Sequence, residues 1–183
     1  MYYRKIIRLP KEKTLTLLIG IPAVGKTFLA NKMKIVNSYK RVIISSDEIR
    51  RNILRSKETK IYFDQGKEGE IWDIIEKKVY EQLINTDVKE CVLDAVNLKY
   101  FSRHIFIHMA KELKIKTKGI VIYRSLKKIM KWNINRKYPV SESLILQFFK
   151  HFEPSLQDEF DILIKIGSFR KFQKERKKFK SLT

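Results

Sequence analysis

The feature that most restricts the fold of this chain is the segment Gly20-Ile-Pro-Ala-Val-Gly25-Lys26-Thr27, which matches the complete phosphate-binding loop pattern. Such a loop must follow a buried strand and open a helix, because backbone N–H groups and the positive end of the helix surround the phosphate oxygens. Both neighbours are present, since Thr14 to Ile19 is an apolar, strand-like run and Thr27 to Ile35 has a helical pattern. We therefore predict a nucleoside triphosphate site in which Lys26 bridges the β- and γ-phosphates and the Thr27 hydroxyl ligates Mg²⁺.

The rest of the chain alternates between the strand and the helix pattern. Four further strands are predicted, at Arg41 to Ser45, Cys91 to Leu93, Thr117 to Tyr123 and Ile162 to Ile166. The predicted helices cover Asp47 to Arg55, Glu68 to Asn85, Phe101 to Leu113, Ser125 to Asn135 and Ser141 to Phe152. This alternation predicts an α/β fold: a mostly parallel central sheet of about five strands with helices on both faces and a helical lid.

Two charged side chains follow the second predicted strand, where ligands of parallel sheets bind. Asp47 could accept a proton from an attacking hydroxyl group, and Arg50, one helical turn later, could hold an acceptor phosphate. The alternative for this segment is helix capping, with Ser46 or Asp47 as the N-cap, and capping does not exclude catalysis.

Two further positions complete the candidate site. Asp94 ends the third predicted strand, where a carboxylate can hold Thr27 and, through water, Mg²⁺. Arg136 lies between two predicted helices, where an arginine can stabilise the charge of a transferring phosphoryl group. An exposed cation at a helix end is the alternative for Arg136. The residues predicted to bind the nucleotide are Gly20, Ile21, Pro22, Ala23, Val24, Gly25, Lys26, Thr27 and Arg136.

The charge balance points to a polyanionic partner. The 183 residues contain 40 Lys and Arg against 20 Asp and Glu, a formal net charge of +20. A codon bias towards lysine is the alternative source of this excess. We divide the chain into a kinase-like domain, residues 1–167, and a basic C-terminal tail, residues 168–183, in which phenylalanines alternate with lysines and arginines. The tail is interpreted either as a polyanion contact or as a solvated helix or frayed end.

Other residues carry less information. Cys91 is the single cysteine, and it is interpreted as a buried thiol in a reducing compartment. His104 and His108 lack a third metal ligand, Trp72 is assigned to the core, and Trp132 could stack on a base.

Met1 to Leu9 lacks the long apolar run of a signal peptide, and no apolar stretch is long enough to span a membrane. We therefore expect a cytoplasmic protein that does not interact with a membrane.

Several of these motifs, in this order, resemble the kinase domain of the polynucleotide 5′-hydroxyl kinases. The resemblance runs from Leu15 to Ile166. It rests on the phosphate-binding loop, Asp47 with Arg50, Lys67-Glu68-Gly69, Asp94-Ala-Val-Asn97, Asn133-Ile-Asn-Arg136, Pro139-Val140, Phe152-Glu153-Pro154 and Asp158-Glu159-Phe160-Asp161.

The resemblance implies a role for each site residue. Asp47 is the general base, Arg50 contacts the phosphate next to the acceptor nucleotide, and Arg136 is the lid arginine. Lys26 and Thr27 serve ATP and Mg²⁺, and Asp94 supports that site. Three departures stand out: no counterpart of a phosphatase half, the order Pro139-Val140, and the basic tail.

The sequence thus predicts an enzyme that transfers the γ-phosphate of ATP to the 5′-hydroxyl end of RNA or DNA, in nucleic acid repair. Two alternatives remain at this point. One is a small-molecule kinase of the same fold, acting on a nucleotide sugar, an antibiotic or a nucleotide. The other is a nucleic-acid-binding ATPase that transfers phosphate to no acceptor.

Overall fold

The central feature of the computed structural model, which describes residues 13–35, 40–54 and 67–181, is one sheet of five parallel strands. Its spatial order is β2-β3-β1-β4-β5, and every neighbouring pair is parallel. The strands are β1 (Thr14–Ile19), β2 (Arg41–Ser45), β3 (Glu90–Asp94), β4 (Lys116–Ile122) and β5 (Ile162–Ile166). The predicted α/β fold is confirmed, and the sheet is entirely parallel.

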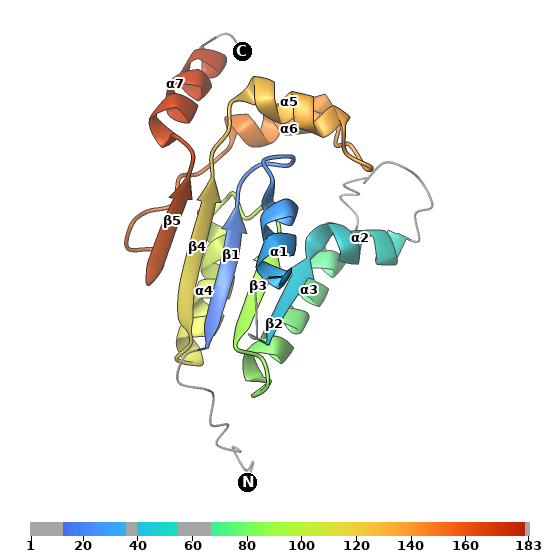
Figure 1. Ribbon diagram of the computed structural model, residues 1–183, viewed down its shortest axis with the longest axis vertical. Coiled ribbons are helices and arrows are strands. Elements are labelled where there is room, and N and C mark those ends of the chain that lie inside the picture. The colour runs from blue at the N-terminus through green and yellow to red at the C-terminus, as the bar shows by residue number, and fades with distance from the viewer. Residues whose placement is uncertain (1–12, 36–39, 55–66, 182–183) are drawn as a thin grey trace.

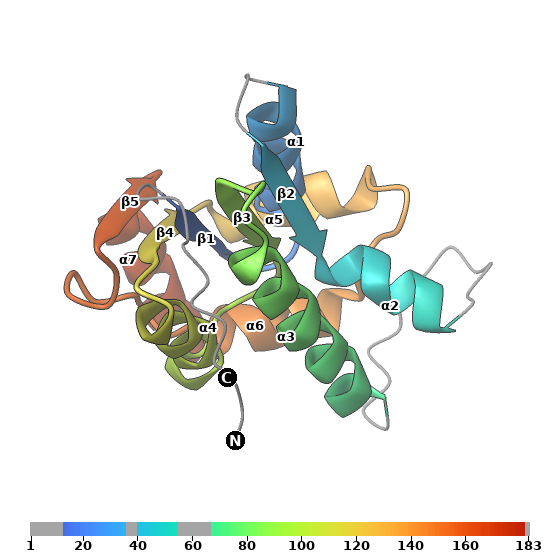
Figure 2. The same cartoon turned by 90° about the horizontal axis from the view of Figure 1, so that it is seen from below.

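Helices lie on both faces of this sheet and above the carboxyl ends of its strands. Helix α1 lies on one face, and α3 and α4 lie on the other (Figures 1 and 2). Helices α5, α6 and α7 lie beyond the strand ends. The helices are α1 (Lys26–Ile35), α2 (Ser46–Leu54), α3 (Glu68–Ile84), α4 (Tyr100–Glu112), α5 (Leu126–Ile134), α6 (Glu142–Lys150) and α7 (Phe169–Lys180). The bounds of α1 to α6 lie within two residues of those predicted, whereas no helix bounds were predicted for α7. Arg55, the predicted end of α2, and Met1 to Leu9 lie outside the described residues.

The core forms because the central strands are apolar on both faces. All of β3 is buried, and the consecutive residues Leu17, Leu18 and Ile19 of β1, which alternate between the two faces, have no exposed surface. Burial raises the pKa of the Cys91 thiol to about 12, so this cysteine is an unreactive core residue, as predicted. None of the helices in the described part of the chain has both the length and the apolarity of a membrane span.

The segment after α6 is anchored to α4 by a buried ion pair. Arg103 of α4 is fully buried and donates to both carboxylate oxygens of Glu159. It also donates to the backbone carbonyls of Leu98, at 2.7 Å, and Glu153, at 3.3 Å. The Phe152-to-Asp161 segment that contributed to the family resemblance therefore has an architectural role in this chain.

We expect Arg103→Ala to lower the free energy of unfolding by about 3–5 kcal/mol, because it leaves the Glu159 carboxylate buried without its partner. Urea denaturation followed by tryptophan fluorescence measures this change. The control, Lys111→Ala, removes an exposed cation from the same helix and should change stability by less than about 0.5 kcal/mol. A decrease below about 1 kcal/mol for Arg103→Ala would contradict this role.

The last helix has two opposite faces. Phe172 of α7 is 3% exposed and packs against Tyr123, Phe149 and Phe152. The only acidic residue of the helix, Glu175, accepts hydrogen bonds from the backbone N–H of Leu126 at the start of α5. The exposed cations of α7 are Arg170, Lys171, Lys174, Lys177, Lys178 and Lys180. Most of the segment predicted as a tail, 168–181, is thus packed onto the domain; residues 182–183 lie outside the described residues.

Candidate active site

The phosphate-binding loop joins β1 to α1 at the carboxyl end of the sheet (Figure 1). The backbone of Gly25 has a φ of 101° and that of Ala23 a φ of 64°, so the loop includes left-handed residues that turn its N–H groups inward. The Lys26 ammonium group donates to the backbone carbonyls of Gly20, at 2.6 Å, and Ile21, at 3.1 Å. The loop therefore wraps around its own lysine.

Thr27 and Asp94 lie together, as expected for a magnesium site. The Thr27 hydroxyl donates to Asp94 Oδ2 at 2.7 Å, although 67 residues separate them. Burial raises the pKa of the Asp94 carboxyl, while the charge of Lys26 and the Thr27 hydrogen bond oppose that rise. A hydroxyl and a carboxylate beside a phosphate site suit Mg²⁺, which binds through one or two protein oxygens, substrate phosphates and water. The described residues contain no cluster of three or more His, Cys, Asp or Glu side chains that could hold a metal alone.

Electrostatics couple the loop lysine to the other charged candidates. Burial lowers the pKa of Lys26 to about 8, and Arg136 acts in the same direction. The charges of Asp94 and Asp47 oppose this shift. Four of the residues singled out in the sequence therefore lie within electrostatic reach of one another.

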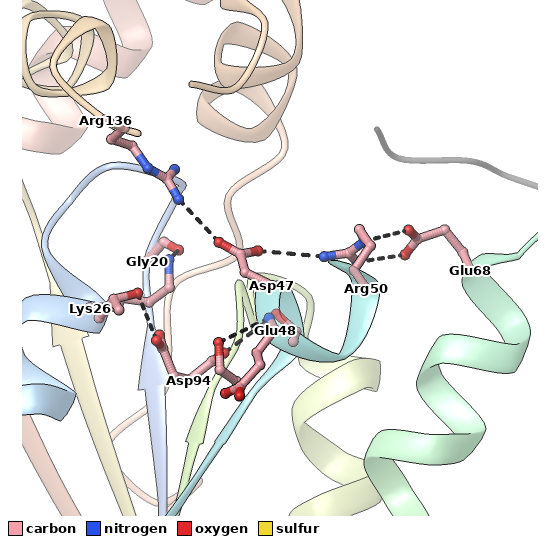
Figure 3. A network of polar contacts seen from close by, with 11 residues as sticks. Gly20, Lys26, Asp47, Glu48, Arg50, Glu68, Asp94 and Arg136 are labelled. Atoms are coloured by element: carbon pink, nitrogen blue, oxygen red, sulfur yellow. Dashed lines mark hydrogen bonds and ion pairs between the residues drawn. The ribbon is translucent and has the colours of Figure 1, made fainter. Parts of the chain in front are cut away.

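Asp47 and Arg136 meet across the site. Asp47 lies in the first turn of α2, and Arg136 follows α5; the Arg136 Nη2 atom is 3.1 Å from Asp47 Oδ2 (Figure 3). Asn133 holds the connection after α5, because its side chain donates to the Val140 carbonyl and accepts from the Val140 N–H. This pair of bonds explains the asparagine of the Asn133-to-Arg136 motif as a structural residue.

Arg50 points away from Arg136 and towards α3. Its guanidinium donates to both oxygens of the Glu68 carboxylate, each at 3.0 Å, and its Nη1 lies 3.5 Å from Asp47 Oδ1. Arg50 is 2% exposed. Figure 3 shows Arg136, Asp47, Arg50 and Glu68 in a row of alternating charge. The structure thus places Arg50 behind Asp47, and its contact with an acceptor phosphate stays a prediction.

Most of the candidate site residues surround a cavity of about 410 Å³, which Arg50 and Glu68 do not line. Lys26, Thr27, Asp47, Asp94 and Arg136 all line it. Its other lining residues are Pro22, Ala23, Gly25, Phe28, Ser45, Ser46, Arg51, Ala95, Val96, Trp132, Lys137, Tyr138 and Val140. Sequence reasoning missed Arg51, Lys137 and Tyr138. Arg51 could have been found, because it lies four residues after Asp47 and therefore on the same face of the helix.

A second cavity, of about 460 Å³, lies beside the phosphate-binding loop and is almost entirely apolar. Gly25, Phe28 and Trp132 line both cavities. Lys128 and Arg124 place their cationic groups 4.8 and 5.9 Å from the Trp132 ring centre. The contact of Trp132 with a base stays a prediction, whereas Trp72 is half-buried against Phe106.

The histidine pair of α4 lies outside both cavities. His104 and His108 are exposed, and their ring centres are 6.1 Å apart. They do not belong to a metal cluster among the described residues.

Comparisons with known proteins agree with this fold. A family model described as an AAA domain matches residues 15–155 of the chain. The structure of Chaetomium thermophilum Kti12 in complex with ADP-AlF3 has a TM-score of 0.62 at 14% identity, over 91% of this chain and 97% of that one. A gluconokinase from Sinorhizobium meliloti 1021 has a TM-score of 0.59 at 13% identity, over 93% and 91%.

A third similar structure is larger than this chain. One chain of the Pnkp1/Rnl/Hen1 RNA repair complex has a TM-score of 0.58 at 16% identity, over 95% of this chain but 46% of its own length. No curated protein sequence matches the chain. At these identities the likenesses establish the P-loop kinase fold.

Proposed function

The chain belongs to the AAA domain family, and on that premise we propose that it is an ATP-dependent phosphotransferase acting on the 5′-hydroxyl ends of polynucleotides. One observation carries the proposal: the Asp47 carboxylate lines the same cavity as Lys26 and Thr27 of the phosphate-binding loop. A carboxylate opposite a triphosphate site is where a base for an attacking hydroxyl is needed.

The chemistry follows from this arrangement. The acceptor hydroxyl oxygen forms a bond to the γ-phosphorus, the bond from that phosphorus to the β–γ bridging oxygen breaks, and ADP leaves. Asp47 takes the hydroxyl proton, while Lys26 and Arg136 neutralise the charge on the phosphoryl oxygens. Thr27 and Asp94 would hold Mg²⁺, which when bound supplies further neutralisation of the phosphates.

The charge distribution supports a polynucleotide as the acceptor. The net charge is +20, and the single acid of α7 is turned towards α5, so the exposed side of that helix carries only cations. Cations spaced along a helix suit repeated phosphates, whereas a small acceptor would contact the cavity alone. The likeness to a chain of an RNA repair complex is consistent with this choice.

A small-molecule kinase is the second candidate, since a gluconokinase has a similar fold. To decide between them, the protein is incubated with γ-labelled ATP, Mg²⁺ and a panel of 5′-hydroxyl RNA and DNA oligonucleotides, single- and double-stranded. We expect label at the 5′ end. If oligonucleotide stimulates ATP hydrolysis but receives no label, a nucleic-acid-binding ATPase is favoured instead. If oligonucleotide is not labelled and does not stimulate hydrolysis, the small-molecule kinase is favoured.

The basic face of α7 predicts a steep salt dependence of oligonucleotide binding. Replacing Arg170, Lys171, Lys174, Lys177 and Lys178 by glutamine leaves the buried Phe172 in place, which removal of the helix would not. Fluorescence anisotropy should show a log Kd against log salt slope that is shallower by about 0.7 for each single-strand phosphate that the variant no longer neutralises. Single-turnover transfer at saturating oligonucleotide should stay close to wild type.

The matched control replaces Lys77, Lys78 and Lys111, exposed cations of α3 and α4, by glutamine. It should keep the wild-type slope. If the wild-type slope is nearly flat, the charge excess is compositional, and the small-molecule kinase becomes the better proposal.

A further inference from the structure

The feature that carries the inference is a tyrosine with two cations over its ring. The Arg51 guanidinium carbon lies 5.1 Å from the centre of the Tyr138 ring, and the Lys137 ammonium nitrogen lies 5.4 Å from it. Arg51 belongs to α2, whereas Lys137 and Tyr138 follow Arg136 in the connection to α6. All three residues line the cavity that contains Asp47.

Two neighbouring arginines of α2 point in different directions. Arg50 is buried against the Glu68 carboxylate and does not line the cavity. Arg51 is half-buried and lines it. Since Arg51 follows Asp47 by four residues, one helix face presents both the candidate base and a guanidinium to the same space.

This combination suits one chemical class of ligand. The guanidinium and ammonium groups offer donors to a phosphate, and when they turn from the Tyr138 ring to such a phosphate, the ring offers a face on which a base can stack. The cavity wall therefore has a surface for each half of a nucleotide, next to the carboxylate that would take the hydroxyl proton.

From this geometry we infer that Arg51, Lys137 and Tyr138 form the subsite for the acceptor nucleotide, with Tyr138 under its base and Arg51 and Lys137 on its 3′-phosphate. The inference rests on the proposed function, and it names which residues bind the substrate. Arg50 is then a positioning residue, which lies beside the Asp47 carboxylate oxygen that Arg136 does not contact.

Two acceptors that differ by a single phosphate test the subsite. Transfer from γ-labelled ATP is measured with a nucleoside 3′-monophosphate and with the same nucleoside lacking the phosphate. The variants are Arg51→Ala, Tyr138→Ala and Tyr138→Phe, and the control is Lys116→Ala. Lys116 is exposed and begins β4, at the end of the sheet opposite the cavity.

We expect Arg51→Ala to raise KM for the 3′-monophosphate by about 10- to 100-fold, the value of a charge-assisted hydrogen bond. Its KM for the unphosphorylated nucleoside should change by less than about threefold, as should every constant of the control. Tyr138→Ala should raise KM for both acceptors by about tenfold, because it removes the stacking surface, and Tyr138→Phe should not.

The inference is overturned if wild type transfers label while Arg51→Ala and Tyr138→Ala keep wild-type KM values. It is also overturned if Arg50→Gln, and not Arg51→Ala, selectively raises KM for the phosphorylated acceptor. Because Arg50 is a positioning residue, its replacement by glutamine should instead lower kcat equally for both acceptors.

A direct binding measurement distinguishes failure of the subsite inference from failure of the proposed function. Calorimetry with a nucleoside 3′,5′-bisphosphate, which corresponds to the product, needs no catalysis. If wild type transfers no label but binds this compound, and Arg51→Ala weakens that binding, the subsite stands and the proposed reaction fails. If wild type neither transfers nor binds, both are overturned.

Discussion

Replacing Lys26 with alanine is expected to abolish phosphoryl transfer while the protein stays folded. Lys26 is buried in the phosphate-binding loop, and its ammonium group is the cation that would face the β- and γ-phosphates. Its hydrogen bonds go to the loop carbonyls of Gly20 and Ile21, so its removal affects charge more than packing. The measurement is the turnover of label transfer from γ-labelled ATP, together with the circular dichroism spectrum of each variant.

Lys32→Ala is the matched control, because Lys32 is an exposed cation on the same helix. It should keep wild-type turnover. If Lys26→Ala keeps more than about a tenth of wild-type turnover, the assignment of residues 20–27 as the phosphate-binding loop of a kinase is wrong.

Replacing Asp47 with asparagine is expected to lower kcat by roughly 10²- to 10⁴-fold, with ATP affinity little changed. Asparagine keeps the size of the side chain, and its amide oxygen can still accept the hydrogen bond from Arg136, but it cannot take the acceptor proton. Single-turnover transfer to a 5′-hydroxyl oligonucleotide measures the rate, and equilibrium titration measures ATP binding.

Glu48→Gln is the control for this experiment. It removes a neighbouring carboxylate from the same turn of α2, and Glu48 is exposed and does not line the cavity. Its kcat should stay within about threefold of wild type. Normal transfer by Asp47→Asn would mean that Asp47 is not the base, and the acceptor-site proposal would fail.

Much of the fold was predictable because its signals are local. A strand of five to seven residues such as β1 or β4 is recognised from its own apolar run, and the loop from the spacing of Gly20, Gly25 and Lys26. Strands that alternate with helices must connect through right-handed crossovers, which makes a parallel sheet the expected result. The five strands of the structure match the predicted runs to within one residue at each end.

The position of the candidate site was partly predictable from topology. Parallel strands end at the same edge of the sheet, so side chains just after β2 and β3 were expected to approach the loop after β1. The Thr27–Asp94 hydrogen bond is consistent with that reasoning. The contact of Arg136 with Asp47, 89 residues apart, depends on how α5 lies over the strand ends, and no local pattern specifies that.

The sequence by itself thus determined the sheet, the phosphate-binding loop and the set of charged side chains near it. Tertiary structure decided which of those side chains enter the cavity. Arg50 and Arg51 both follow Asp47 at helical spacing, but Arg50 pairs with Glu68 of α3, whereas Arg51 lines the cavity. Likewise, the composition of residues 168–183 allowed a frayed tail, whereas residues 169–180 form a helix whose Phe172 packs against Phe149 of α6. Local patterns restrict backbone conformation, whereas the direction of a long side chain depends on partners that are distant in sequence.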